Sequence, residues 1–347
     1  MPAPLAGRRV LDLGAECSQR PHMLAVSMAA RLCRIYGAET VRPLPVKGEP
    51  LAALPPLLPD GRSALDIFLN AGKRAGPASG HFDAAIGDTG ALARHAAAVP
   101  IKICISVFGP GEDPPMTELG LLALSGLLGI VGEPVPAPPA RLAGHQAAYA
   151  AGLAAATGLL AAVLAGREEV VDVSLLDVTA WLNWKVAADT MATGRAPTRG
   201  DARANWFTVR AKDGHVALVY QERDWPRLRD LIGDPRLNDQ RFASDHDRGV
   251  NRAALLQIIG PWFAARTRAE ITRAAQQRRV PIGPVRQPAE LLTDPQYRVR
   301  GFLAADGAPV LPLIWDGRRL DGEIAKTNDA NAAGSAAAPA SAGAAAP

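Results

Sequence analysis

The sequence has 347 residues, which suits one large domain or two domains of medium size, and 48% of them are hydrophobic. The formal net charge is +4, and the arginines are spread along the chain without a dense basic run. This pattern argues against a nucleic-acid-binding protein. The cysteines Cys17, Cys33 and Cys104 show no C-x-x-C spacing, and no two of the six histidines fall at metal-ligand spacing. We therefore expect no metal site and reduced thiols in a cytoplasmic protein.

Three segments bear on membranes and disorder. The first residues, "MPAPLAGRRVLDL", contain no apolar core before a cleavage site, so we expect no signal peptide. Residues 147–166 are apolar enough to span a bilayer, but alanine dominates them and aromatic anchors are missing, which favours a buried helix and no membrane contact. Residues 327–347 are an Ala/Pro/Gly/Ser-rich stretch, predicted to be a disordered tail.

Strand and helix patterns alternate in the first part of the chain. The expected strands cover 8–13, 39–44, 82–88 and 100–111, and the expected helices cover 21–39 and 89–98. A Pro-rich loop is expected to extend to about residue 62. This alternation predicts an α/β fold with a Rossmann-like parallel sheet.

The later part of the chain changes character after residue 193. Before it we expect helices over 117–129, 144–165 and 176–192 and a strand over 170–175. After a Gly- and Arg-rich loop, the turn at 212–214 predicts a hairpin, followed by helices over 222–232, 249–264 and 267–278 and a strand over 280–285. We therefore predict a large Rossmann-like domain at 1–193, a small α+β domain at 194–303, a return segment at 304–326 and the tail at 327–347.

Two common enzyme motifs are missing. The stretch "VLDLGAE" (10–16) ends like a nucleotide-binding strand, but Ala15, Glu16 and Cys17 follow Gly14 where close approach to a ligand needs further glycines. This argues against a methyltransferase and against a dinucleotide-binding fingerprint. The sequence has no G-x-S-x-G elbow, so an α/β-hydrolase is not supported.

Seven stretches in a fixed order carry a resemblance to a known family. The first six are "PLAGRRVLDL", "YGAETVR", "FLNAGKRAG", "ISVFGPGEDPP", "ALSGLLGIVGEP" and "AAYAAGLAAATGLLAAVLA…EEVVDVSLLDV". The seventh is the distal part from "KDGHVALVY" to "PIGPVRQPAELLTDPQ". On these stretches, which cover about residues 4–303 with gaps, the chain resembles the family III CoA-transferases. This family includes formyl-CoA transferase, carnitine CoA-transferase and α-methylacyl-CoA racemase.

The resemblance implies a fold, a reaction and partners. It implies a Rossmann-like large domain, a smaller domain and two interlocked chains, which form a homodimer or a heterodimer with a homologous subunit. Acyl-CoA and a carboxylic acid would be the substrates, with coenzyme A as a substrate rather than a permanently bound cofactor. In the transferases an Asp on the central helix attacks the acyl-CoA carbonyl, forms a mixed anhydride and then carries CoA as a thioester.

The resemblance also implies that this chain lacks that Asp. The family pattern is Asp-x-x-x-Gly, and counting back from Gly152 leads to Ala148. The racemase reaction would need the same Asp and a His on the preceding helix, where Thr117 and Glu118 stand.

Several residues could supply the chemistry instead. A displaced carboxylate could come from Glu118, Asp113 or Asp201, and His145 could act with Glu118 in general acid–base catalysis. Three hypotheses stay open: a silent subunit with an Asp-bearing homologous partner; an active transferase with a displaced carboxylate; and a hydratase, isomerase, racemase or non-enzymatic CoA-binding protein.

The front of the chain is shortened where the family binds CoA. "GDTG" (87–90) replaces the usual Asn-Phe-x-Pro-Gly turn, and about one strand and one helix are absent before it. The remaining candidates for contact with CoA phosphates are Asn70, Lys73, Arg74 and Arg94, which could equally be ordinary surface residues. Trp181 and Trp184, three residues apart, are interpreted as core, with an aromatic-acid pocket as the alternative.

Overall fold

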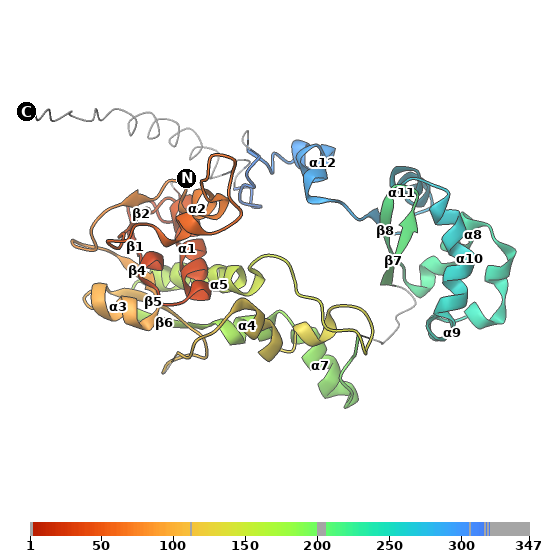
Figure 1. The fold of residues 1–347 in the computed structure, drawn as a ribbon, viewed down its shortest axis with the longest axis horizontal. Helices are drawn as coiled ribbons and strands as arrows, with labels where there is room; N and C mark the ends of the chain where they lie inside the picture. The colour runs from red at the N-terminus through yellow and green to blue at the C-terminus, as the bar shows by residue number, and fades with distance from the viewer. Residues whose placement is uncertain are drawn as a thin grey trace, which may run out of the picture. The chain divides into compact units, whose positions relative to one another are not determined.

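The computed structural model describes residues 3–111, 113–199, 206–304, 307–315, 317 and 319. The chain forms two compact units. Unit 1 comprises Met1–Pro197 and Gly301–Pro347, and unit 2 comprises Thr198–Arg300 (Figure 1). The tail predicted at 327–347 lies outside the described residues.

Unit 1 is built on a six-stranded parallel sheet. In chain order its strands are β1 (Arg9–Asp12), β2 (Glu39–Arg42), β3 (Arg74–Ala75), β4 (Ala84–Gly87), β5 (Ile101–Ser106) and β6 (Glu169–Ser174). The spatial order is β3-β2-β1-β4-β5-β6, and every pair of neighbours is parallel. The central strands are short apolar runs because helices cover the sheet on both faces. This sheet confirms the predicted Rossmann-like fold class.

Seven α-helices belong to the described part of unit 1. They are α1 (Arg20–Ile35), α2 (Ala64–Asn70), α3 (Thr89–His95), α4 (Glu118–Leu124), α5 (Gln146–Ala165), α6 (Leu175–Trp181) and α7 (Trp184–Thr193). Short 3₁₀ helices lie at Gly14–Glu16, Pro50–Ala53 and Leu128–Ile130. α1 and α5 pack on the sheet face that carries Val10 and Ile103, whereas α3 packs on the face that carries Leu11 and Cys104.

Two expectations for unit 1 are wrong. The single helix predicted over 176–192 is two helices, because the chain leaves helical geometry at Asn183 (φ −106°, ψ 13°). The core interpretation of Trp181 and Trp184 also fails, since these side chains are 75% and 60% exposed. Helix α2 was not predicted, because its seven residues are too short to show a clear period.

Unit 2 combines a small antiparallel sheet with helices. The strands β7 (Trp206–Ala211), β8 (Gly214–Val219) and β9 (Ile282–Pro284) pair in this order. The α-helices are α8 (Trp225–Ile232), α9 (Asp245–Val250), α10 (Arg252–Ala264), α11 (Arg268–Gln277) and α12 (Pro295–Val299), and 3₁₀ helices lie at Glu222–Asp224, Pro235–Asn238, Gln240–Phe242 and Pro288–Leu292. The predicted hairpin is confirmed, with Ala211 opposite Gly214.

Helix α5 is a core helix with small residues at its packed face. By length and hydropathy it could cross a membrane, but eight of its residues are buried in the unit, and it packs along α1. At Gly152 the two helices lie so close that an added Cβ atom would be 2.8 Å from the carbonyl oxygen of Ala25 and 2.7 Å from Met28 Cβ. A glycine is therefore required for the two helices to come this close.

We expect Gly152→Ala to lower the free energy of unfolding by about 2 kcal/mol, because overpacking outweighs the gain in helix propensity. Gly260→Ala is the matched control: Gly260 also lies inside a helix, and its added Cβ would meet no atom within 4 Å. The control should be as stable as the unchanged protein or more so. Urea unfolding measures both, and equal stability of the two variants would contradict the close approach.

Candidate functional site

A cavity of about 410 Å³ lies in unit 1, where the amino-terminal ends of three helices meet. It is lined by the start of α1, the start of α4 with the residues before it, and the segment leading into α5. The lining residues are Arg20, Pro21, Leu24, Met116, Thr117, Glu118, Leu119, Arg141 and His145. The fold thus brings together two of the predicted candidates, Glu118 and His145.

Glu118 connects α4 to the beginning of α5. Thr117 caps α4 by accepting a hydrogen bond from the N–H of Gly120, which places Glu118 in the first turn. The Glu118 carboxylate accepts hydrogen bonds from the backbone N–H of Ala147 at 2.6 Å and of Ala148 at 3.3 Å. A carboxylate at a helix amino terminus is stabilised by these free N–H groups and by the helix dipole.

Ala148 lies in the first turn of α5, beside this carboxylate. Its side chain is fully buried in the main hydrophobic cluster of unit 1. The position that the resemblance assigns to the nucleophile therefore carries a buried methyl group, which can neither attack a carbonyl nor accept a proton.

His145 precedes α5 and is half-buried at the cavity. Its ring packs edge-to-face against Tyr149, with the ring centroids 6.0 Å apart. Burial lowers the pKa of His145 from its ordinary value; the negative charge of Glu118 raises it in part, and the positive charges of Arg20 and Arg141 lower it further. The imidazole is therefore neutral at pH 7 and can act as a hydrogen-bond acceptor or base.

Asp113 holds the segment before α4 instead of lining the cavity. One oxygen of its carboxylate lies 2.6 Å from His22 Nε2, and the other accepts a hydrogen bond from the Val107 N–H. Gln19 adds contacts: its amide donates to the carbonyl oxygens of Asp113 and Pro114 and accepts from the Met116 N–H. These bonds from α1 position the chain that carries Glu118.

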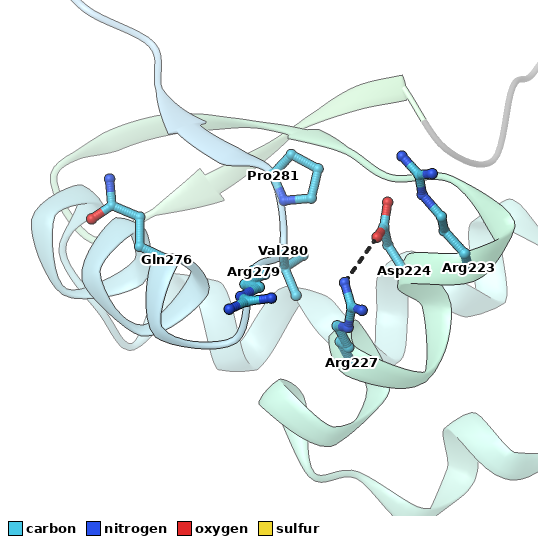
Figure 2. A pocket seen from close by; sticks show the side chains of 7 residues that line it. All are labelled: Arg223, Asp224, Arg227, Gln276, Arg279, Val280 and Pro281. Atoms are coloured by element: carbon cyan, nitrogen blue, oxygen red, sulfur yellow. Dashed lines mark hydrogen bonds and ion pairs between the residues drawn. The ribbon is translucent and has the colours of Figure 1, made fainter.

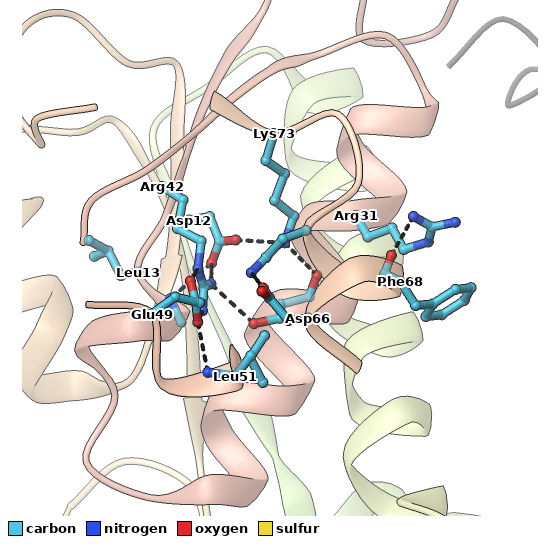
Figure 3. A network of polar contacts seen from close by, with 12 residues as sticks. Asp12, Leu13, Arg31, Arg42, Glu49, Leu51, Asp66, Phe68 and Lys73 are labelled. Carbon is cyan, nitrogen blue, oxygen red and sulfur yellow. Dashed lines mark hydrogen bonds and ion pairs between the residues drawn. The ribbon is translucent and has the colours of Figure 1, made fainter. Parts of the chain in front are cut away.

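The predicted CoA contact Lys73 lies in a buried polar network (Figure 3), and the predicted contact Asn70 accepts a hydrogen bond from it. The Lys73 ammonium donates to Asp12 Oδ2 at 2.7 Å, to the Ser27 carbonyl oxygen at 2.9 Å and to Asn70 Oδ1 at 3.1 Å. Its side chain is 2% exposed, and these three bonds use all three donors of the ammonium. The structure therefore assigns Lys73 to an internal contact, and its role toward CoA stays a prediction.

Arg42 completes this network at its other end. Its guanidinium donates to Asp12 Oδ1 at 2.9 Å and to both carboxylate oxygens of Glu49. Burial raises the pKa of Asp12, but the positive charges of Arg42 and Lys73 and the hydrogen bonds from Lys73 and the Gly14 N–H lower it by more. Asp12 is therefore ionised, and the network joins β1, β2 and the end of α2.

The predicted residues Arg74 and Arg94 do not line the cavity. Arg74 is 74% exposed and pairs with Glu39, and Arg94 is 54% exposed and donates to the Glu16 carbonyl oxygen. Their role toward CoA stays a prediction. Asp201 lies outside the described residues.

Sequence reasoning missed the arginines of the cavity and the contacts of Gln19 and His22. Arg20 and Arg141 line the cavity, and neither forms an ion pair with another described residue. No local pattern marks them, because they are 121 positions apart in the sequence. In the part of the chain that the structure describes, no three His, Cys, Asp or Glu side chains are arranged to hold a metal ion.

Comparison with known proteins identifies the family. The model of CoA-transferase family III matches residues 101–330, which include the cavity residues from Met116 to His145. The chain belongs to CoA-transferase family III. The resemblance noted in the sequence is thereby confirmed.

Individual family III relatives are distant. The chain is 26% identical over 233 residues to a succinate–glutarate CoA-transferase of Agrobacterium fabrum, covering 62% of this chain and 58% of that protein. It is 25% identical over 222 residues to the alpha subunit of a succinyl-CoA–L-malate CoA-transferase of Chloroflexus aurantiacus, covering 59% of this chain and 52% of the relative. The chain thus spans little more than half the length of these curated relatives.

A solved structure of the family has the same fold. The crystal structure of a CAIB/BAIF family protein from Brucella suis matches with a TM-score of 0.77 at 20% sequence identity, over 94% of this chain and all of that one. This agreement confirms the predicted combination of a Rossmann-like sheet and a smaller α+β unit.

Proposed function

We propose that this chain is a subunit of a family III CoA-transferase that lacks the usual Asp nucleophile and works with a homologous partner that carries it. The observation that supports this most directly is the buried methyl group of Ala148 in the first turn of α5. Acyl exchange needs a nucleophile that is also a good leaving group, and an alanine can be neither.

The contacts of Glu118 support a structural role for its carboxylate. The two oxygens accept hydrogen bonds from the first N–H groups of α5. His145 makes no capping hydrogen bond through its side chain, so Glu118 takes the place of an N-cap residue for this helix. Its presence at the cavity is explained without a covalent step.

Exposed apolar side chains support a partner chain. Helix α7 has no buried residue, and its Trp184 and Met191 are 60% and 86% exposed. Trp181 of α6, three residues before Trp184 in the sequence, is 75% exposed. Large apolar side chains grouped on a surface are typical of contact with another protein. The relative from Chloroflexus aurantiacus is itself named as an alpha subunit.

The cavity suits a carboxylic acid. Arg20 and Arg141 contribute positive charge without an acidic partner among the described residues, and a guanidinium binds a carboxylate through paired hydrogen bonds. We propose acyl-CoA and a carboxylic acid as the substrates, and the cytoplasm, where such thioesters are used, as the compartment.

A second candidate is an active transferase in which Glu118 is the nucleophile. Its support is that Glu118 lines the cavity together with Arg20, Arg141 and His145. A Glu118 oxygen would bond to the acyl carbon as the CoA thiolate leaves. The thiolate would then attack the Glu118 carbonyl carbon of the anhydride and release the acid, and the acceptor carboxylate would take over CoA in the reverse order. For this the carboxylate must leave the N–H groups of Ala147 and Ala148.

The mass of the native protein, purified alone and with a co-encoded homologous chain, tests both proposals. Hydroxylamine added during acyl-CoA turnover would mark the carboxylate that forms the adduct, and peptide mass spectrometry would locate it. The first proposal expects a heteromer with the adduct on the partner chain only. An adduct on Glu118 in a protein that turns over alone, lost in Glu118→Gln, would establish the second. Turnover without any hydroxylamine-sensitive adduct would contradict both.

A further inference from the structure

Unit 2 contains a second hollow, of about 600 Å³, between the start of α8 and the end of α11 (Figure 2). Arg223, Arg227 and Arg279 line it together with Asp224. None of its lining residues belongs to the cavity of unit 1. A function for it is therefore independent of the acyl-transfer proposal.

The charges around this hollow are unbalanced. The Asp224 side chain is 9% exposed; it accepts a hydrogen bond from the Gln221 N–H, and its Oδ1 lies 3.5 Å from Arg227 Nη1. Arg223 and Arg279 have no acidic partner among the residues that the structure describes. Three arginines and one aspartate line the hollow, so two positive charges remain unbalanced. A bound anion would relieve the repulsion between them.

The unusual backbone conformation of Arg279 is a second feature of this hollow. Its φ angle of +57° is the only positive one at a described non-glycine residue. This position follows the last turn of α11, where a glycine is the usual choice because a Cβ atom is strained there. An arginine held in a strained conformation at a hollow is typical of a functional position.

We propose that this hollow binds the diphosphate group of a small metabolite. Guanidinium groups match phosphate oxygens with paired hydrogen bonds, and three of them suit a group with several negative charges. Val280 and Pro281 form an apolar wall between Arg279 and the Asp224–Arg227 pair (Figure 2). Gln276 contributes a side-chain amide to the lining. The volume admits the diphosphate of a nucleotide as well as inorganic pyrophosphate.

Calorimetric titration of the full chain with inorganic pyrophosphate and with ADP tests this proposal. We expect saturable binding that is weakened about tenfold or more in Arg279→Gly and in Arg223→Met. Arg279→Gly removes the guanidinium but suits the left-handed backbone, so thermal unfolding should show a variant at least as stable as the unchanged protein. Arg278→Met is the matched control: it removes the neighbouring exposed arginine, which does not line the hollow.

The two probes distinguish a site for inorganic pyrophosphate from a site for a nucleotide diphosphate. Equal affinity for both probes would support a site for the diphosphate group alone, and tighter binding of ADP would support contact of the organic part with Val280 and Pro281. The proposal is overturned if neither probe binds saturably, or if Arg279→Gly binds them as well as Arg278→Met does.

Discussion

Lys73→Met is expected to lower the free energy of unfolding by about 3 to 5 kcal/mol, the range for breaking one side of a buried ion pair. The substitution removes three hydrogen bonds and leaves Asp12, which is fully buried, with Arg42 as its remaining cationic partner. Arg42 must also neutralise Glu49, so the buried network would carry a net negative charge. Urea unfolding at neutral pH measures the loss.

Arg74→Met is the matched control for this prediction. Arg74 is the next residue in the chain, but its side chain is 74% exposed and pairs with Glu39 at the surface. An exposed ion pair of this kind contributes less than about 1 kcal/mol. In the double variant Asp12→Asn/Lys73→Met the unpaired charge is gone, so part of the stability should return. If Lys73→Met were as stable as Arg74→Met and only the affinity for CoA fell, Lys73 would be a CoA contact, as the sequence suggested.

Glu118→Ala is expected to lower the free energy of unfolding by about 2 kcal/mol, because two N–H groups at the start of α5 lose a charged acceptor. Glu118→Gln retains one acceptor oxygen and should lose about half as much. Glu168→Gln is the control, since it removes a carboxylate at an exposed position. Equal stability of all three variants would show that Glu118 does not cap α5.

The substitution Glu118→Gln should also change the pKa of His145. Burial lowers the pKa of His145 below the ordinary value of 6.5, and Glu118 offsets part of this effect. The unfolded chain therefore takes up a proton at a higher pH than the folded chain, so that acidification through pH 6.5 favours unfolding. Glu118→Gln should lower the pKa of His145 further and extend this loss of stability to lower pH. NMR titration of the imidazole measures the shift, and an unchanged pKa would show that Glu118 and His145 do not interact.

The contacts of Lys73 and Glu118 could not be predicted from the sequence, because their partners are distant along the chain. Lys73 lies three residues after Asn70 and directly before Arg74 in a turn, a context that indicates a surface residue able to reach a phosphate. Its burial follows from Asp12 and Ser27, which are 61 and 46 positions away and come together with it only in the folded sheet and α1. The bond from Glu118 to α5 likewise joins positions about 30 residues apart, and no local period indicates it.

The sequence by itself determined the order of strands and helices, the parallel sheet of unit 1, the hairpin of unit 2 and the alanine at position 148. Hydrophobic period, turn residues and motif spacing are local properties, so they can be derived from residues that are close together in the sequence. Only the tertiary structure decided which polar groups meet. These are the His22–Asp113 contact, the Asp12–Arg42–Lys73 network, and the arginines that line the cavity of unit 1 and the hollow of unit 2. The energy of these pairs depends on distance and burial, and both arise only when distant segments pack together.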